Sequence, residues 1–155
     1  MRNVTLRCQV VCLLAVSVFY AQSMVAQESP SAAKGCSNAT LRGSFGYTST
    51  GTLLDSFVPP PFAGPFGEIG RQTFDGKGNT NATATVSSNG NISTVGVNGT
   101  YTVNSDCTGS MTLNIPDFGA TVHANFVIDD SATELRAIGT DAGVIETRVY
   151  KKQCR

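Results

Sequence analysis

The chain has 155 residues, of which 11 are basic and 11 acidic, so its formal net charge is zero. Only 14% of the residues are charged, and there is no tryptophan. This length is typical of a single domain, and without a basic stretch the chain is not expected to bind nucleic acid. The one basic cluster lies at the extreme C-terminus, where a solvated end explains it: Lys151, Lys152 and Arg155.

The first residues have the features of a secretory signal peptide. Arg2 and Arg7 precede an apolar run over residues 10–21. This run matches the apolar core of a signal peptide and is shorter than the roughly 20 residues that span a bilayer. We predict a signal peptide over residues 1–26, with cleavage after Ala21 or an uncleaved membrane anchor as alternatives. Cleavage leaves a secreted or periplasmic protein without a stable membrane span.

The chain after this segment has the composition of strands and tight turns. A polar spacer over residues 27–40 comes first, and from there Thr, Val, Gly, Asn and Ser dominate. Turn sequences such as Asp75-Gly76 and Asn89-Gly90 supply the positive-φ positions of hairpins. Between such turns we predict eight strands, over residues 41–54, 67–75, 81–88, 93–104, 110–115, 120–128, 133–140 and 144–151.

The order and patterning of these strands predict an all-β fold. Over residues 110–115 every second side chain is apolar, which gives the strand one face for a core. Short sequential hairpins favour a meander over a Greek key, and closing the meander removes its exposed edges. We therefore predict a single eight-stranded antiparallel up-and-down barrel over residues 41–155, with a β-sandwich as the alternative.

One connection is long and contains three consecutive prolines. It covers residues 55–66, and Pro59, Pro60 and Pro61 cannot pair as a central strand. We expect this loop to pack over one mouth of the barrel.

Three cysteines follow the signal segment: Cys36, Cys107 and Cys154. In an oxidising compartment they suggest one disulfide and one free thiol. The residues alone leave all three pairings open. A zinc site needs paired ligands two to four residues apart, so this spacing predicts no metal site.

Three blocks of sequence carry a resemblance to a known group of proteins. They are residues 36–47 (CSNATLRGSFGY), 69–79 (IGRQTFDGKGN) and 99–109 (GTYTVNSDCTG). In this order they resemble uncharacterised exported small β-barrel proteins of soil bacteria. The resemblance implies a barrel similar in architecture to the allene oxide cyclase or calycin type, and architecture carries no activity with it. It also implies a Cys36–Cys107 disulfide, because both cysteines lie inside matching blocks.

The candidate ligand-binding residues are Tyr47, Arg71, Tyr101, His123 and Phe126. The aromatic residues are expected to fill or line the barrel interior. An interior arginine such as Arg71 can bind a carboxylate ligand. His123 is the only histidine, and it lies opposite the face of Phe126, toward either the lumen or water. No serine or cysteine nucleophile motif accompanies it, so no catalytic triad is predicted.

These observations favour an exported barrel that binds a small apolar or amphipathic molecule at its mouth, near the proline-rich loop. One alternative is a cyclase- or isomerase-like enzyme whose lumen positions its substrate, with Tyr47, Arg71 and His123 as polar contacts. Another is a structural or surface-interaction protein with a filled core. The sequence contains no cofactor motif, and we expect no cofactor.

Overall fold

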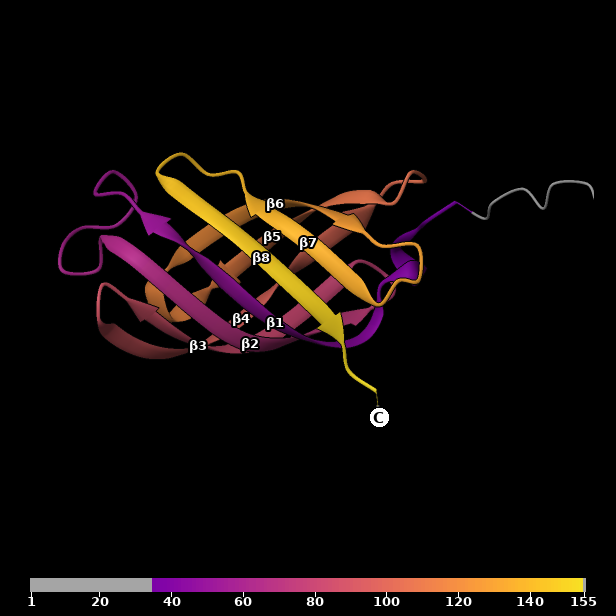
Figure 1. Cartoon of the computed structure of the whole chain (residues 1–155), viewed down its shortest axis with the longest axis horizontal. Helices are drawn as coiled ribbons and strands as arrows, with labels where there is room; N and C mark the ends of the chain where they lie inside the picture. The colour runs from indigo at the N-terminus through magenta and orange to yellow at the C-terminus, as the bar shows by residue number, and fades with distance from the viewer. Residues whose placement is uncertain (1–34, 155) are drawn as a thin grey trace, which may run out of the picture. The chain divides into compact units, whose positions relative to one another are not determined.

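The computed structural model describes residues 35–154, so the predicted signal peptide and most of the predicted spacer lie outside the described residues. Eight strands form a closed antiparallel barrel in which each strand pairs with the next and β8 returns to pair with β1 (Figure 1). The prediction of an up-and-down barrel is therefore confirmed, and the alternative of a β-sandwich does not apply. The strands are β1 (Arg42–Leu53), β2 (Gly64–Asp75), β3 (Asn79–Ser88), β4 (Asn91–Val103), β5 (Thr108–Ile115), β6 (Ala120–Ile128), β7 (Glu134–Gly139) and β8 (Val144–Lys152).

All eight predicted strands are present, with ends that shift by up to a few residues. The clearest difference is at the start of β2, which begins at Gly64 where the sequence predicted residue 67. Pro65, within the predicted loop, belongs to β2 and pairs in register with Thr52 of β1, whereas pairing with β3 begins only at Phe66. A proline is tolerated where one side of the strand is unpaired.

One end of the barrel is filled by large side chains, and we call it the capped end. Leu41, Phe45 and Phe74 are almost completely buried there. The ring of Phe74 packs edge-on against Phe45 and Tyr101, with ring centroids 5.5 and 5.1 Å apart. Such edge-to-face pairs stabilise a core beyond the area they bury. The capped end therefore has no space for a ligand.

The segment that precedes β1 crosses the capped end and is bonded to it. It includes η1 (Asn38–Thr40), a single turn of 3-10 helix. The side-chain oxygen of Asn38 accepts a hydrogen bond from the backbone N–H of Val103 at 2.8 Å. The hydroxyl of Tyr101 donates to the carbonyl of Leu41 at 2.9 Å and accepts from the backbone N–H of Gly76. These bonds satisfy polar groups that closure of the barrel end would otherwise bury without partners.

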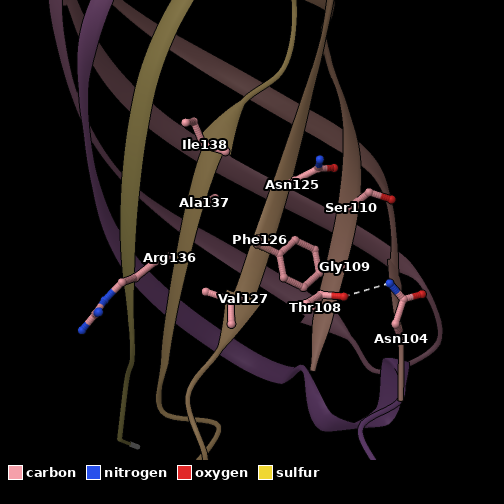
Figure 2. A pocket seen from close by; sticks show the side chains of 10 residues that line it. All are labelled: Asn104, Thr108, Gly109, Ser110, Asn125, Phe126, Val127, Arg136, Ala137 and Ile138. Atoms are coloured by element: carbon pink, nitrogen blue, oxygen red, sulfur yellow. Dashed lines mark hydrogen bonds between the residues drawn. The ribbon is translucent and has the colours of Figure 1, made fainter. Parts of the chain in front are cut away.

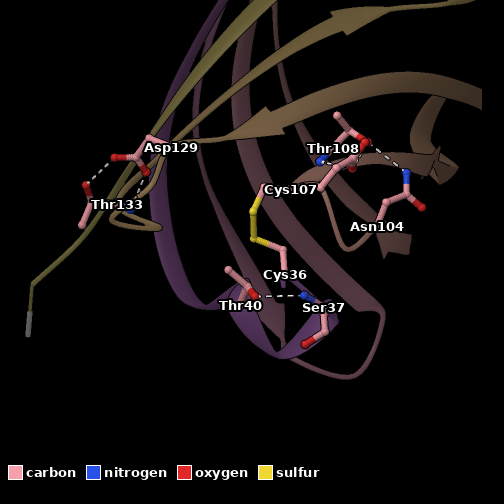
Figure 3. Close-up of a disulfide and its surroundings, with 9 residues drawn as sticks. Cys36, Ser37, Thr40, Asn104, Cys107, Thr108, Asp129 and Thr133 are labelled. Carbon is pink, nitrogen blue, oxygen red and sulfur yellow. Dashed lines mark hydrogen bonds between the residues drawn. A yellow bond between two sulfur atoms is a disulfide. The ribbon is translucent and has the colours of Figure 1, made fainter. Parts of the chain in front are cut away.

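A disulfide between Cys36 and Cys107 fixes this segment to the turn between β4 and β5 (Figure 3). The pairing implied by the resemblance is thus confirmed. Cys154 is free and exposed. Within residues 35–154, no helix has both the length and the apolar character needed to cross a membrane.

Replacing both bridged cysteines, as Cys36→Ser with Cys107→Ser, should lower the free energy of unfolding by about 2–5 kcal/mol. The bridge joins residues 71 positions apart, so its loss releases a long loop in the unfolded chain. Urea unfolding monitored by circular dichroism measures the change. The control is Cys154→Ser, which should unfold like the wild type. Equal stability of the double variant and the wild type would contradict the expectation.

The turn between β6 and β7 depends on one carboxylate, Asp129, which lies near the disulfide in Figure 3. Its Oδ1 accepts hydrogen bonds from the backbone N–H groups of Thr133 and Glu134, each at 2.8 Å. The Ser131 hydroxyl donates to Oδ2. Hydrogen bonds from Ser131, and then from the backbone of Glu134 and Thr133, lower the pKa of Asp129 from 3.8 to about 2.

We expect this turn to make the protein acid-sensitive in a defined pH range. Because the folded pKa of Asp129 lies below the unfolded value of 3.8, its stabilisation is present above about pH 4 and is lost as the pH falls toward 2. Asp129→Asn should lower the melting temperature at pH 7 and flatten its decline between pH 4 and 2. The neighbouring Asp130→Asn is the control. Parallel melting profiles for wild type and Asp129→Asn would refute the assignment.

Candidate functional site

The end of the barrel opposite the cap opens into a cavity of about 600 Å³, which we call the mouth cavity. Its wall is mostly apolar and is formed by inward-facing side chains of the strands: Leu53, Phe66, Val86, Val95, Val97, Leu113, Ile115, Val122 and Val144. Apolar walls with a few convergent polar groups are the usual construction of a small-molecule site.

The loop between β1 and β2 lies over this end, as the sequence predicted (left of Figure 1). It contributes Phe57, Val58, Pro59 and Phe62 to the lining. Neighbouring strand ends hold it in place. The Ser88 hydroxyl donates to the carbonyl of Phe62 at 2.7 Å, and the side-chain amide of Asn89 donates to the carbonyl of Pro61 at 3.0 Å.

Three ionisable side chains form the floor of the mouth cavity: Glu68, Glu146 and Arg148. Each is about nine-tenths buried, with side-chain exposures of 10%, 9% and 10%. The guanidinium of Arg148 bonds to Oε1 of Glu146 through Nε at 2.9 Å and through Nη2 at 2.5 Å. A longer contact of 3.5 Å joins Nη2 to Oε2 of Glu68. We call these three residues the floor cluster.

A layer of hydrogen-bonded side chains supports the floor cluster from beneath. The hydroxyl of Ser49 donates to Oε1 of Glu146 at 2.6 Å, and the hydroxyl of Tyr47 donates to Oε1 of Glu68. Nη1 of Arg148 donates to the Tyr150 hydroxyl at 3.2 Å, and that hydroxyl donates to Gln72 at 3.0 Å. Buried charges are tolerated where such bonds replace water.

The surroundings fix the protonation of this layer. Burial, and after it the charge of Glu68, raises the pKa of Tyr47 well above its usual value, so this tyrosine stays a neutral donor. Burial opposes the charge of Arg148, but the neighbouring Tyr150, Glu68 and Glu146 outweigh it, so the pKa of Arg148 is raised. Arg148 therefore remains a cation inside the barrel.

The structure brings only some of the sequence-predicted ligand residues near this cavity. Tyr47 lies directly beneath the floor, with the guanidinium carbon of Arg148 4.9 Å from its ring centroid. Tyr101 belongs to the capped end, where its hydroxyl holds the N-terminal segment. Phe126 is buried over Gly109, and a Cβ at Gly109 would come within 2.3 Å of its ring.

Arg71 and His123 lie on the outer surface of the barrel. Arg71 is exposed on β2, whose inward positions are occupied by residues such as Gln72 and Phe74. His123 is half exposed, and its Nδ1 lies 2.7 Å from a carboxylate oxygen of Asp141. Neither side chain can contact a molecule in the lumen together with Tyr47. The interior arginine is Arg148, which was not among the predicted site residues.

A second hollow, of about 650 Å³, lies on the outer wall over β5, β6 and β7 (Figure 2). The side chains of Ser110, Asn125 and Arg136 around it are exposed. It is as large as the mouth cavity but lies open to solvent, so it cannot remove an occupant from water. We therefore take the mouth cavity as the candidate site.

Solved structures similar to this chain are barrels. A redesigned beta barrel, b11L5F_LGL, has a TM-score of 0.54 and 19% identity, and the match covers 76% of this chain and 95% of that one. The redesigned barrel mFAP1 bound to DFHBI has a TM-score of 0.50 and 19% identity, and the match covers 74% of this chain and 97% of that one. EF1p2_mFAP2b bound to DFHBI has a TM-score of 0.51 and 14% identity, and the match covers 78% of this chain and 98% of that one. At these identities the likeness shows the fold alone.

No family of known proteins matches the sequence, and none of the curated proteins is similar to it. The barrel architecture implied by the resemblance is confirmed. Membership of an exported soil-bacterial group and likeness to allene oxide cyclase or to calycin-type barrels stay predictions.

Proposed function

We propose that this protein binds a small, largely apolar molecule in the mouth cavity. The observation that carries the proposal is the asymmetry of the interior: large aromatic side chains fill the capped end, whereas the other end keeps about 600 Å³ open. A core that served stability alone would be filled, because unfilled volume in a core is destabilising.

Two further observations support a binding role. The wall is apolar while the floor carries ionisable polar groups, so the cavity offers both burial for a molecule and a polar anchor for its orientation. Barrels of the same fold have been solved with the small molecule DFHBI bound, so the architecture is compatible with a ligand.

We also propose that the protein works outside the cytoplasm. The Cys36–Cys107 disulfide supports this, because disulfides persist in oxidising compartments and are rare in the cytosol. The predicted signal peptide over residues 1–26 gives the same location.

Titration with the uncharged fluorescent probe N-phenyl-1-naphthylamine tests the binding proposal. We expect saturable one-to-one binding with a rise in fluorescence as the probe leaves water. Val122, on β6, lines the cavity and is only half buried, so Val122→Trp should fill part of the space and weaken binding by about tenfold or more.

The matched control is Thr94→Trp, which adds the same ring to an exposed position on β4. It should bind the probe like the wild type, and thermal melting verifies that both variants are folded. Absence of a saturable signal, or equal affinity of Val122→Trp and Thr94→Trp, would refute binding in the mouth cavity.

A further inference from the structure

We propose that the occupant of the mouth cavity carries a positively charged nitrogen, such as a primary amine, on an apolar body. This inference rests on the binding function proposed above and adds the chemical class of the ligand. It follows from the charge and the hydrogen bonding of the floor cluster.

The floor cluster holds two carboxylates and one guanidinium, so its formal charge is −1. The other polar side chains that line the cavity are neutral: Ser88, Asn91, Ser93 and Thr121. No second cation therefore balances the extra carboxylate among the lining residues of the described chain. Charges interact more strongly in a poorly hydrated cavity than in water. The negative floor cluster therefore attracts an entering cation and repels an entering anion.

The guanidinium of Arg148 is not free to anchor an anionic ligand. Its Nε and Nη2 donate to Glu146, Nη1 donates to Tyr150, and Nη2 also approaches Glu68. A carboxylate ligand would have to displace one of these partners and then lie beside the two glutamates. The arginine thus serves as a counter-ion within the floor.

The acceptor capacity of the floor is incompletely used. Oε1 of Glu146 accepts the bonds from Ser49 and Arg148, whereas no donor among residues 35–154 bonds to Oε2. The side chain of Glu146 is more than nine-tenths buried and lines the cavity. At Glu68, Oε2 receives only the 3.5 Å contact from Arg148. These carboxylate oxygens match the N–H donors of an ammonium group, since charge-assisted hydrogen bonds are the strong ones.

The experiment compares three probes with the same eight-carbon chain and different head groups: octylamine, 1-octanol and octanoate. Each displaces N-phenyl-1-naphthylamine from the protein at pH 7, where octylamine is a cation and octanoate an anion. We expect octylamine to act at about tenfold lower concentration than octanoate, with octanol between them.

The variant Glu146→Gln makes the floor cluster neutral and should remove most of this preference. Glu134→Gln is the matched control, because Glu134 pairs with Arg136 two residues away on the outer face of β7. It should keep the preference of the wild type. If Glu146→Gln fails to fold, Glu68→Gln makes the same change in formal charge.

The possible outcomes distinguish failure of the amine assignment from failure of the binding function. Octanoate binding as well as octylamine, or a preference that survives in Glu146→Gln and Glu68→Gln, overturns the amine assignment and leaves the binding function standing. If isothermal titration calorimetry detects no binding of octylamine and N-phenyl-1-naphthylamine also fails to bind, both proposals are overturned.

Discussion

Arg148→Met should lower the free energy of unfolding by about 3–5 kcal/mol. The substitution leaves the carboxylates of Glu68 and Glu146 buried with no cation to balance them, and uncompensated buried charges are strongly destabilising. Urea unfolding at pH 7, monitored by far-ultraviolet circular dichroism, measures the loss.

The chain contains its own control for this substitution. Arg136 forms the same two-residue pair with Glu134, but on the outer face, where its side chain is 74% exposed. Arg136→Met should change stability by no more than about 0.5 kcal/mol. Adding Glu68→Gln and Glu146→Gln to Arg148→Met should recover much of the loss. Equal losses in the two arginine variants would contradict the role assigned to the floor cluster.

Gly51→Ala should prevent the barrel from closing normally and cost about 4 kcal/mol or more. A Cβ at this position would lie 1.8 Å from the carbonyl oxygen of Ile145 and 2.8 Å from the ring of Phe66. The first of these contacts is with the backbone of β8, so no side-chain rotation relieves it. The strands β1 and β8 would have to separate where they close the barrel.

Gly96→Ala is the matched control for this glycine. Gly96 lies on β4, and a Cβ there would have no atom within 4 Å. Soluble yield and thermal melting should distinguish the two variants, with Gly96→Ala close to the wild type. A Gly51→Ala protein that melts like the wild type would show that the strands accommodate the added carbon.

The fold was predictable because its determinants are local. Turns such as Asp75-Gly76 and Asn89-Gly90 mark the hairpins, and β6 has the bounds that alternation predicted. The disulfide was not fixed by the residues themselves, because three cysteines allow three pairings and only the resemblance selected one. The strand starts were less predictable, because polar residues next to the turns, such as Asn79 and Asn91, continue the pairing of the strands.

The candidate site was harder to predict from the sequence, because alternation defines two faces of a strand without showing which face points into the barrel. Once Phe74 is taken as an interior residue, the two-residue repeat places Glu68 inside and Arg71 outside, and this step could have been made from the sequence. On β8 the pattern misleads. Ile145 and Val149 mark one face as apolar, but both are exposed. The opposite face, with Glu146, Arg148 and Tyr150, points inward.

The cap formed by the N-terminal segment has a kinetic consequence. An open tube offers its contents two exits, whereas this barrel is sealed at one end by Tyr101, η1 and the disulfide. A molecule bound in the mouth cavity, as proposed, would have to enter and leave through the single open end, past residues 54–63. Its residence time would then depend on the barrier to exit at the open end and not on how tightly the sealed end is packed.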